Sequence, residues 1–250
     1  MTTTLKLLTY NIHKGFSPAR LRFHLPRMRQ QLELLKTDVV FLQEVQGAHK
    51  RQEKRIRNWP DETQLEYLAA QIWPHTAYGK NAIYDAGHHG NAILSKYPFI
   101  TWENINVAMT TRASRSVLHG SIRLPNCDVD IHLMCIHFGL FKVEREFQID
   151  ALCDRIAAHV PPNEPLIIAG DFNDWRNAAT EYLESQMGLT EVFKFLEGDY
   201  AKTFPALKPT LQTDRIYFRN LSLVTGQCLQ QRPWRTLSDH LPLIAEFTLF

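Results

Sequence analysis

The sequence lacks most features that would place the protein in a specialised class. Its 250 residues contain four cysteines, Cys127, Cys135, Cys153 and Cys228, with no CxxC pair and no spacing typical of a metal site. Reduced thiols are therefore expected. No apolar run is long enough to span a bilayer, and the chain passes from Met1 almost directly into a predicted strand without a leader pattern. These absences predict a cytoplasmic protein.

Linkers, repeats and a strong net charge are also missing. No Gly/Ser-rich or Pro-rich segment interrupts the chain, so residues 1–250 are expected to form one domain and a monomer. The formal charge of +2 gives no argument for nucleic acid or anionic lipid as a partner, and contact with a membrane surface stays open. With 44% hydrophobic and 22% charged residues, the chain can build a large core.

The most informative segment runs from Leu166 to Asp174. Its apolar first half follows Pro165 and predicts a strand buried on both faces, after which Gly170 lets the chain leave the sheet. Asp171 and Asn173 come next, two residues apart, so in extended backbone their side chains point the same way. The pair is either an ordinary turn after a core strand or a carboxylate and an amide that converge on a ligand.

Polar residues also flank other predicted strands, which cover 5–10, 38–44, 117–123, 129–136, 214–218 and 243–249. These residues are Asn11, Glu44, Arg115, His137, Asp214, Asp239 and His240, with Arg112 near Arg115. Each alone can be a turn former or a surface residue. In layered α/β proteins, however, sites assemble in the loops at strand ends, so together they predict a shared site.

The chemistry of this set, with Asp171 and Asn173, is specific. It holds four carboxylates, two imidazoles and two amides, but no nucleophile elbow and no Gly-rich phosphate loop. Oxygen ligands with few nitrogens favour a hard cation, Mg²⁺ or Mn²⁺. Such a cation beside His and Asp suits hydrolysis of a phosphate ester by direct attack of water.

Two other features allow two interpretations each. The stretch from His49 to Arg57 carries five Lys/Arg and is either a solvated face or a contact for a polyanion. His88 and His89 lie in a predicted loop over 86–91 and could touch a ligand, although no third partner stands at a known spacing. Helices are predicted after Pro26, after a capping box at 63–66, and over 149–160, each with an apolar stripe that belongs to the core.

The ordered series of motifs closely resembles the endonuclease/exonuclease/phosphatase superfamily over essentially the whole chain. The motifs are Asn11, Gln43-Glu44, His137, Gly170–Asn173, Asp214 and Ser238–His240. The stretches 11–15, 87–91 and 171–175 resemble an uncharacterised bacterial branch of it. The resemblance implies a deoxyribonuclease-I-like α/β fold, a four-layer sandwich in which two mixed β-sheets pack face to face with helices outside.

The resemblance also implies a role for each site residue. Glu44 would be the main metal ligand, with Asn11 and Asp239 close by. Asp214 would orient His240, and either His240 or Asp171 would be the general base. The donors of hydrogen bonds to the phosphate oxygens would be Asn173, His137 and Arg115. Because His13 stands where abasic-site enzymes have an Asp, the number of metal ions stays open.

The function implied is a Mg²⁺-dependent phosphodiester hydrolase, with a nuclease acting on DNA as the favoured form. The basic stretch and the residues Trp59, Trp73 and Trp175 favour a polymeric anion, weakly. The alternative is a phospholipid, sphingolipid or inositol-phosphate esterase, for which an exposed apolar loop is expected and none is obvious. A non-catalytic binding module would have lost site residues, and all eight are present.

Overall fold

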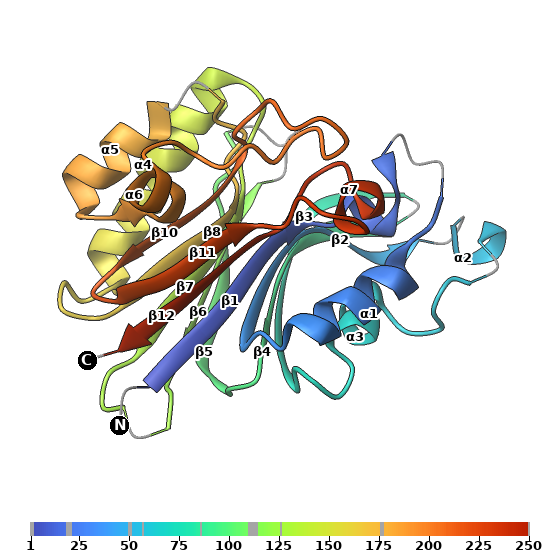
Figure 1. Cartoon of the computed structure of the whole chain (residues 1–250), viewed down its shortest axis with the longest axis horizontal. Coiled ribbons are helices and arrows are strands. Elements are labelled where there is room, and N and C mark those ends of the chain that lie inside the picture. Colours follow the sequence, from blue (N-terminus) through green and yellow to red (C-terminus); the bar gives the residue numbers. More distant parts are fainter. Residues whose placement is uncertain are drawn as a thin grey trace.

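The apolar runs form strands of two six-stranded sheets that pack face to face (Figure 1). The computed structural model describes residues 3–18, 22–49, 52–56, 58–85, 87–109, 115–125, 127–175 and 178–249. The first sheet has the order β11-β12-β1-β2-β4-β3. Its strands are β1 (Thr3–Asn11), β2 (Val39–His49), β3 (His75–Tyr84), β4 (Gly87–Ser95), β11 (Ser222–Cys228) and β12 (Leu243–Leu249).

The second sheet has the order β5-β6-β7-β8-β10-β9. Its strands are β5 (Phe99–Asn106), β6 (Ser116–Ile122), β7 (Ile131–His137), β8 (Leu166–Asp171), β9 (Thr190–Glu191) and β10 (Asp214–Arg219). Each sheet contains one parallel pair, β1 with β2 and β7 with β8, among antiparallel neighbours. The predicted four-layer sandwich of two mixed sheets is confirmed.

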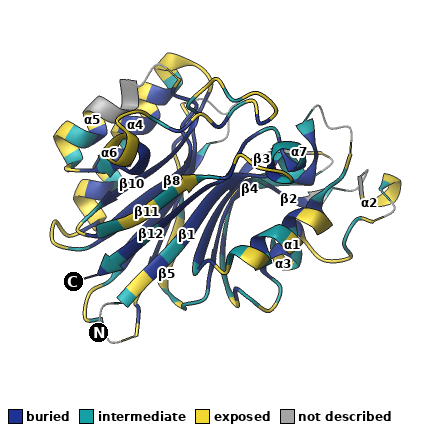
Figure 2. Cartoon of the chain, in the orientation of Figure 1, coloured by how far each residue is buried: buried dark blue, intermediate teal, exposed yellow. Residues whose placement is uncertain are grey.

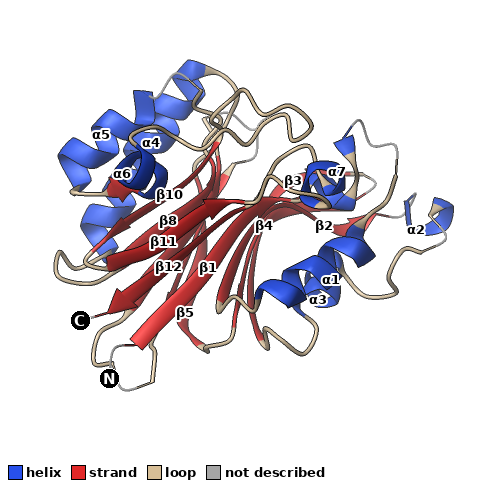
Figure 3. Ribbon diagram, in the orientation of Figure 1, coloured by secondary structure: helices blue, strands red, loops and turns tan. Residues whose placement is uncertain are grey.

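Helices cover the outer face of each sheet (Figure 3). The first sheet is covered by α1 (Leu25–Leu35), α3 (Gln64–Ala69) and α7 (Trp234–Leu237), and the second by α4 (Lys142–His159) and α5 (Ala178–Met187). The helix α6 (Val192–Glu197) contacts β10 and β11, and short turns are formed by η1 (His13–Gly15) and α2 (Gln52–Arg55). The capping box predicted at Thr63 and Glu66 is present at the start of α3.

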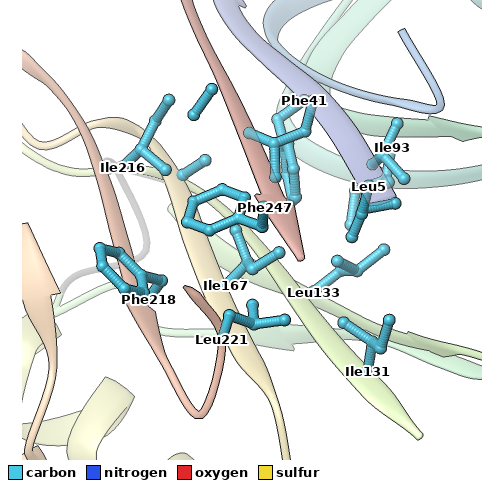
Figure 4. Packing of buried hydrophobic residues seen from close by; sticks show 14 of the residues in the cluster. Leu5, Phe41, Ile93, Ile131, Leu133, Ile167, Ile216, Phe218, Leu221 and Phe247 are labelled. Carbon is cyan, nitrogen blue, oxygen red and sulfur yellow. The ribbon is translucent and has the colours of Figure 1, made fainter. Parts of the chain in front are cut away.

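The alternation of side chains explains why the central strands read as unbroken apolar runs. On β1, Leu5 and Leu7 point into the layer between the sheets, whereas Leu8 and Tyr10 point toward the helices. Figure 4 shows side chains of both sheets meeting in the inner layer, and Figure 2 shows the central strands buried along most of their length. Each large apolar side chain buried in this way contributes about 1.5–3 kcal/mol.

Several predicted boundaries are wrong. The predicted loop over 86–91 is part of β4 from Gly87 onward, because Gly87, His88, His89 and Gly90 pair with β2 and β3. The predicted strand ending at Glu44 continues to His49. The edge or outer strands β3, β5 and β11 are not predicted, since one face of each is polar or exposed and the apolar pattern is weak.

No helix in the described part of the chain is both long enough and apolar enough to cross a membrane. All four cysteines are free, as predicted, and Cys135 and Cys153 are buried.

Candidate active site

One edge of the sandwich gathers the polar ends of six strands. The two parallel pairs, β1 with β2 and β7 with β8, bring their Asn11–Gln43 and His137–Asp171 ends to this edge. The antiparallel strands β10 and β12 begin there, so residues just before or at their starts face the same space. A cavity of about 390 Å³ results. Its lining includes Asn11, Glu44, Arg115, His137, Asp171, Asn173 and His240.

Gly170 permits the close approach that places His137 beside Asp171. The residue has φ +150°, and a Cβ on it would lie 2.1 Å from the carbonyl oxygen of Ile136 on β7. Only glycine allows this backbone contact, which keeps Ile136 opposite Gly170 and His137 opposite Asp171 in the parallel register. The glycine of the central motif therefore sets the position of two site residues.

Glu44 and Asn173 reach the cavity through left-handed backbone, with φ values of +57° and +50°. Glu44 lies where the register between β2 and β4 shifts between Leu42 and Val45, which is a bulge inside the strand. Non-glycine residues in this region of φ are uncommon, and they cluster at functional sites. A bulge, not the predicted strand end, aims the Glu44 carboxylate.

Asp171 lies at the centre of the polar network. Asn11 Nδ2 donates to Asp171 Oδ2 at 3.1 Å, and the backbone N–H of Asn173 donates to Asp171 Oδ1 at 3.0 Å. The Nε2 atoms of His137 and His240 lie 3.5 and 3.8 Å from Asp171 Oδ2. Burial raises the pKa of Asp171 to about 7, with His240 opposing this shift and Asp214 adding to it.

Asp214 holds His240 from behind. His240 Nδ1 lies 2.8 Å from Asp214 Oδ2, and this oxygen also accepts from Thr203 Oγ1 at 2.5 Å and Thr213 Oγ1 at 2.9 Å. Burial alone would lower the pKa of His240, but the two carboxylates, Asp214 first and then Asp171, raise it to about 10. His240 is therefore an imidazolium at neutral pH, with Nδ1–H donating to Asp214.

The remaining two basic groups at the cavity differ in charge. Burial, and then the neighbouring Arg115, hold the pKa of His137 well below its usual value, so this imidazole is neutral. Burial also lowers the pKa of Arg115, while Asp171 and Glu44 oppose the shift, and a guanidinium stays charged in proteins. Asn173 Nδ2 donates to the Phe138 carbonyl at 3.0 Å and keeps one further N–H.

Two residues of a neighbouring turn were missed as site residues. His13 and Lys14 both have left-handed φ, +45° and +58°. Lys14 Nζ lies 2.5 Å from Glu44 Oε2, and His13 Nδ1 lies 3.6 Å from Asp239 Oδ1. Two basic residues two and three positions after Asn11 were the available signal, but their backbone conformation could not be read from the sequence.

The donor set at this edge fits a hard divalent cation. The predicted ligands Asn11, Glu44 and Asp239 offer only oxygen atoms. Burial would raise the pKa of Glu44, but the adjacent Lys14 ammonium holds it well below its usual value, so the carboxylate is ionised. Asp239 does not line the cavity itself but stands beside it, where Ser238 Oγ donates to its Oδ1 at 3.3 Å.

A tighter trio has the wrong chemistry for a metal cage. Ligand atoms of Asp171, Asp214 and His240 all lie within 4.8 Å of one another. The oxygen of Asp214 that faces His240 already accepts three hydrogen bonds. That oxygen is not an open ligand for a metal ion.

The structure corrects several expectations about which residues contact the substrate. Trp73 is fully buried and donates its indole N–H to the Thr37 carbonyl, so it cannot stack on a substrate. Trp59 stacks on Phe23, and Trp175 is the tryptophan that lines the cavity. Three of the five Lys/Arg of the basic stretch, Lys50, Arg51 and Arg57, lie outside the described residues, as does Arg112.

Apolar lining residues were also missed. Leu140, Phe204 and Leu211 line the cavity beside Trp175. The expectation that the chain exposes no apolar loop is wrong, because Leu140 and Phe141, at the end of the loop before α4, are exposed, as is Val143 in the first turn of α4.

Comparisons with known proteins identify the family of the chain. The model of the endonuclease/exonuclease/phosphatase family matches residues 8–240. The chain is 44% identical over 246 residues to the uncharacterised protein YbhP of Escherichia coli (strain K12), covering 98% of this chain and 97% of that protein.

Two solved structures have a similar fold at low identity. TDP2 of D. rerio, complexed with a single-strand DNA product, has a TM-score of 0.73 at 20% identity, covering 98% of this chain and 99% of that one. A mannosyl-6-phosphatase of Bacteroides thetaiotaomicron has a TM-score of 0.73 at 16% identity, covering 97% and 99%. The chain belongs to the endonuclease/exonuclease/phosphatase family and is a phosphoester hydrolase of that family.

Proposed function

We propose that this family member hydrolyses phosphodiesters with the help of one divalent cation, Mg²⁺ or Mn²⁺, by in-line attack of water. The observation that carries the proposal is that Glu44, Asp171 and His240, which are far apart in the sequence, line one cavity. A binding module would have no need of a buried carboxylate, an imidazolium and a guanidinium around one space.

Glu44, with Asn11 and Asp239, would hold the cation. When bound, the cation supplies Lewis-acid polarisation of a phosphoryl oxygen and steadies the charge of the leaving group. Lys14 already contributes positive charge at Glu44. Lys14 lies beside Glu44 and His13 lies beside Asp239, so a basic side chain already stands next to each acidic ligand. This arrangement supports a site for a single metal ion.

Asp171 is the better candidate for the general base. It is central in the network, it faces the cavity, and its raised pKa suits proton transfer near neutral pH. His240 carries its proton already, because Asp214 and Asp171 stabilise the imidazolium. Its Nε2–H would donate to a phosphoryl oxygen and stabilise the negative charge of the transition state.

Three further groups would bind the non-bridging oxygens. Arg115 provides a charged donor, and neutral His137 and the spare N–H of Asn173 provide neutral ones. Water would attack phosphorus from the side opposite the leaving oxygen, one P–O ester bond would break, and the products would be an alcohol and a phosphomonoester.

DNA is the substrate that the sequence favours. The structure of TDP2 with a DNA product, which has the same fold, supports DNA as the substrate here. Among the described residues, Trp175 and Arg115 are the groups at the cavity suited to a base and a phosphate. The exposed apolar residues beside the same cavity favour the second candidate, a lipid phosphodiester.

A substrate panel with and without chelator tests the proposal. Purified protein with Mg²⁺ is incubated with plasmid, abasic oligonucleotide, phospholipid, sphingomyelin, inositol phosphates and bis(p-nitrophenyl) phosphate. We expect hydrolysis of at least one diester, its loss in EDTA and its recovery with Mg²⁺ or Mn²⁺. Glu44→Gln should weaken Mn²⁺ binding measured by calorimetry. Turnover that EDTA leaves unchanged would contradict the proposal.

A further inference from the structure

The loop between β7 and α4 and the first turn of α4 expose apolar side chains beside the cavity. We call Leu140–Val143 the rim segment. The exposed fractions of Leu140, Phe141 and Val143 are 57%, 72% and 60%. Single exposed apolar residues are common on protein surfaces, but here three of four consecutive residues are apolar and exposed, and exposed apolar patches mark interaction sites.

The rim segment is held in place by buried polar groups. The side chain of Arg145 is buried, and its Nη1 donates to the Leu140 carbonyl at 2.6 Å. Gln148 Oε1 accepts from the Gly139 backbone N–H at 2.8 Å. These bonds fix the loop backbone in a conformation that turns Leu140 and Phe141 to solvent. Their exposure is thus built into the fold.

Phe141 also occupies a position where a polar residue would stabilise the helix. It is the N-cap residue of α4 and makes no side-chain capping bond. A Ser, Thr, Asp or Asn at an N-cap typically stabilises a helix by satisfying a free backbone N–H. Phe141 lacks that stabilisation and leaves 72% of its surface exposed.

The patch is continuous with the catalytic cavity. Leu140 lines the cavity together with Trp175 and Leu211, so one end of the rim segment forms part of its wall. Leu207, close in sequence to Leu211, is exposed as well. A protein partner seated on the rim segment would lie across this wall and obstruct the entry of substrate.

The charges of the rim are poorly suited to nucleic acid. Lys142 Nζ lies 3.4 Å from Glu146 Oε1, and Arg145 Nε lies 3.8 Å from Asp174 Oδ1. Binding to a polyanion needs cations that release its counterions. Both cations lie beside carboxylates, whereas the side chains of Leu140, Phe141 and Val143 are exposed.

We infer that the rim segment docks the enzyme on a lipid surface and that the phosphodiester cleaved is that of a glycerophospholipid head group. Leu140, Phe141 and Val143 enter the boundary between head groups and acyl chains, and Lys142 keeps its ammonium at the head-group level. A surface of this kind presents phosphodiesters directly to a cavity whose wall touches it. The inference about the head group rests on the proposed hydrolysis, whereas the docking does not.

Vesicle flotation of the full chain in EDTA tests docking apart from catalysis. Wild-type protein should float with vesicles of phosphatidylcholine and phosphatidylglycerol. Phe141→Ser should lower the partition coefficient about tenfold, from the loss of one buried aromatic side chain. The matched control is Leu34→Ser on α1, since Leu34 is 68% exposed and lies on the helix layer of the other sheet. It should float as the wild type does. Circular dichroism and thermal unfolding check that both variants are folded.

Three results would overturn the docking. The wild type does not float with the vesicles, Phe141→Ser floats as well as the wild type, or Leu34→Ser lowers the partition coefficient as much as Phe141→Ser does. A dimer in gel filtration that Phe141→Ser dissociates would assign the patch to a second copy instead.

Hydrolysis with Mg²⁺ then separates the two proposals. Cleavage of vesicle phospholipid supports the head-group assignment. Docking with cleavage of plasmid or soluble diester alone overturns that assignment and leaves phosphodiester hydrolysis intact. Docking without cleavage of any diester overturns the proposed function and leaves the docking on a lipid surface supported.

Discussion

Strand β7 carries one member of each of two buried histidine pairs, and the two pairs differ in how their ring nitrogens are bonded. His132 near its start contacts His119 of β6, with 2.9 Å between Nδ1 and Nε2. His137 at its end shares Asp171 with His240. Burial is similar in the two pairs, so burial alone does not identify a catalytic histidine.

The first pair forms a closed chain of hydrogen bonds. Arg155 Nε donates to His119 Nδ1 at 3.1 Å, so the proton of His119 is on Nε2 and is donated to His132. His132 Nε2 then donates to Glu164 Oε2 at 2.7 Å. Every ring nitrogen has a partner, and none is left to act on a substrate.

The second pair is open toward the cavity. The distances from the Nε2 atoms of His137 and His240 to Asp171 Oδ2 exceed those of ordinary hydrogen bonds, and all three residues line the cavity. The contrast teaches that a buried imidazole with an unused nitrogen beside a cavity indicates chemistry. A buried imidazole with both nitrogens bonded indicates structure.

Breaking the open pair should have the largest effect, and it should be on rate. Asp171→Asn and His240→Ala should each lower kcat by about 10²–10⁴, because a positioned base or proton donor is lost. The double variant should be little worse than either single one, since the two groups act as a unit. The measurement is kcat on a hydrolysed diester from the substrate panel, with far-UV circular dichroism to confirm folding. Full turnover in both single variants would assign the chemistry to other residues.

Breaking the closed pair should instead cost stability. His132→Ala leaves the buried Nε2–H of His119 without its acceptor, which costs about 1–3 kcal/mol of unfolding free energy. Urea denaturation measures the loss, while kcat per folded molecule should stay at the wild-type level. His159→Ala is the matched control. His159 is an exposed histidine at the end of α4, and it lines the surface hollow that His119 and His132 also line. Its cost should be below about 1 kcal/mol. A fall in kcat for His132→Ala would show that the closed pair is coupled to the cavity.

The strands that could be predicted are those buried on both faces. Segments such as 5–10 and 166–171 are apolar without interruption because one face meets the other sheet and the next meets helices. The strand β5 could not be predicted in this way, since most of its residues are exposed at the sheet edge. Predicted elements therefore concentrate in the middle of each sheet.

The site was predictable where polar residues end apolar runs, and not where backbone conformation brings them in. Asp171 and His137 could be placed by their strands. Lys14 reaches Glu44 only because a turn of non-glycine residues adopts left-handed φ, for which the sequence has no reliable sign. The rim segment was missed for another reason, since the exposure of Leu140–Val143 depends on the backbone conformation that Arg145 and Gln148 hold.

Acidification gives the most specific test of the closed pair. Burial, and then His132 and Arg155, lower the pKa of His119 from 6.5 to about 3. The unfolded chain therefore binds a proton at His119 that the folded chain does not, and this part of the stability is complete above pH 6.5 and is lost as the pH falls toward 3. His119→Gln removes the titration, so the difference in unfolding free energy between wild type and variant should shrink over this range. Urea midpoints at several pH values measure it. A difference that is constant with pH would mean that His119 titrates alike in both states and that the chain of bonds around it does not hold it neutral.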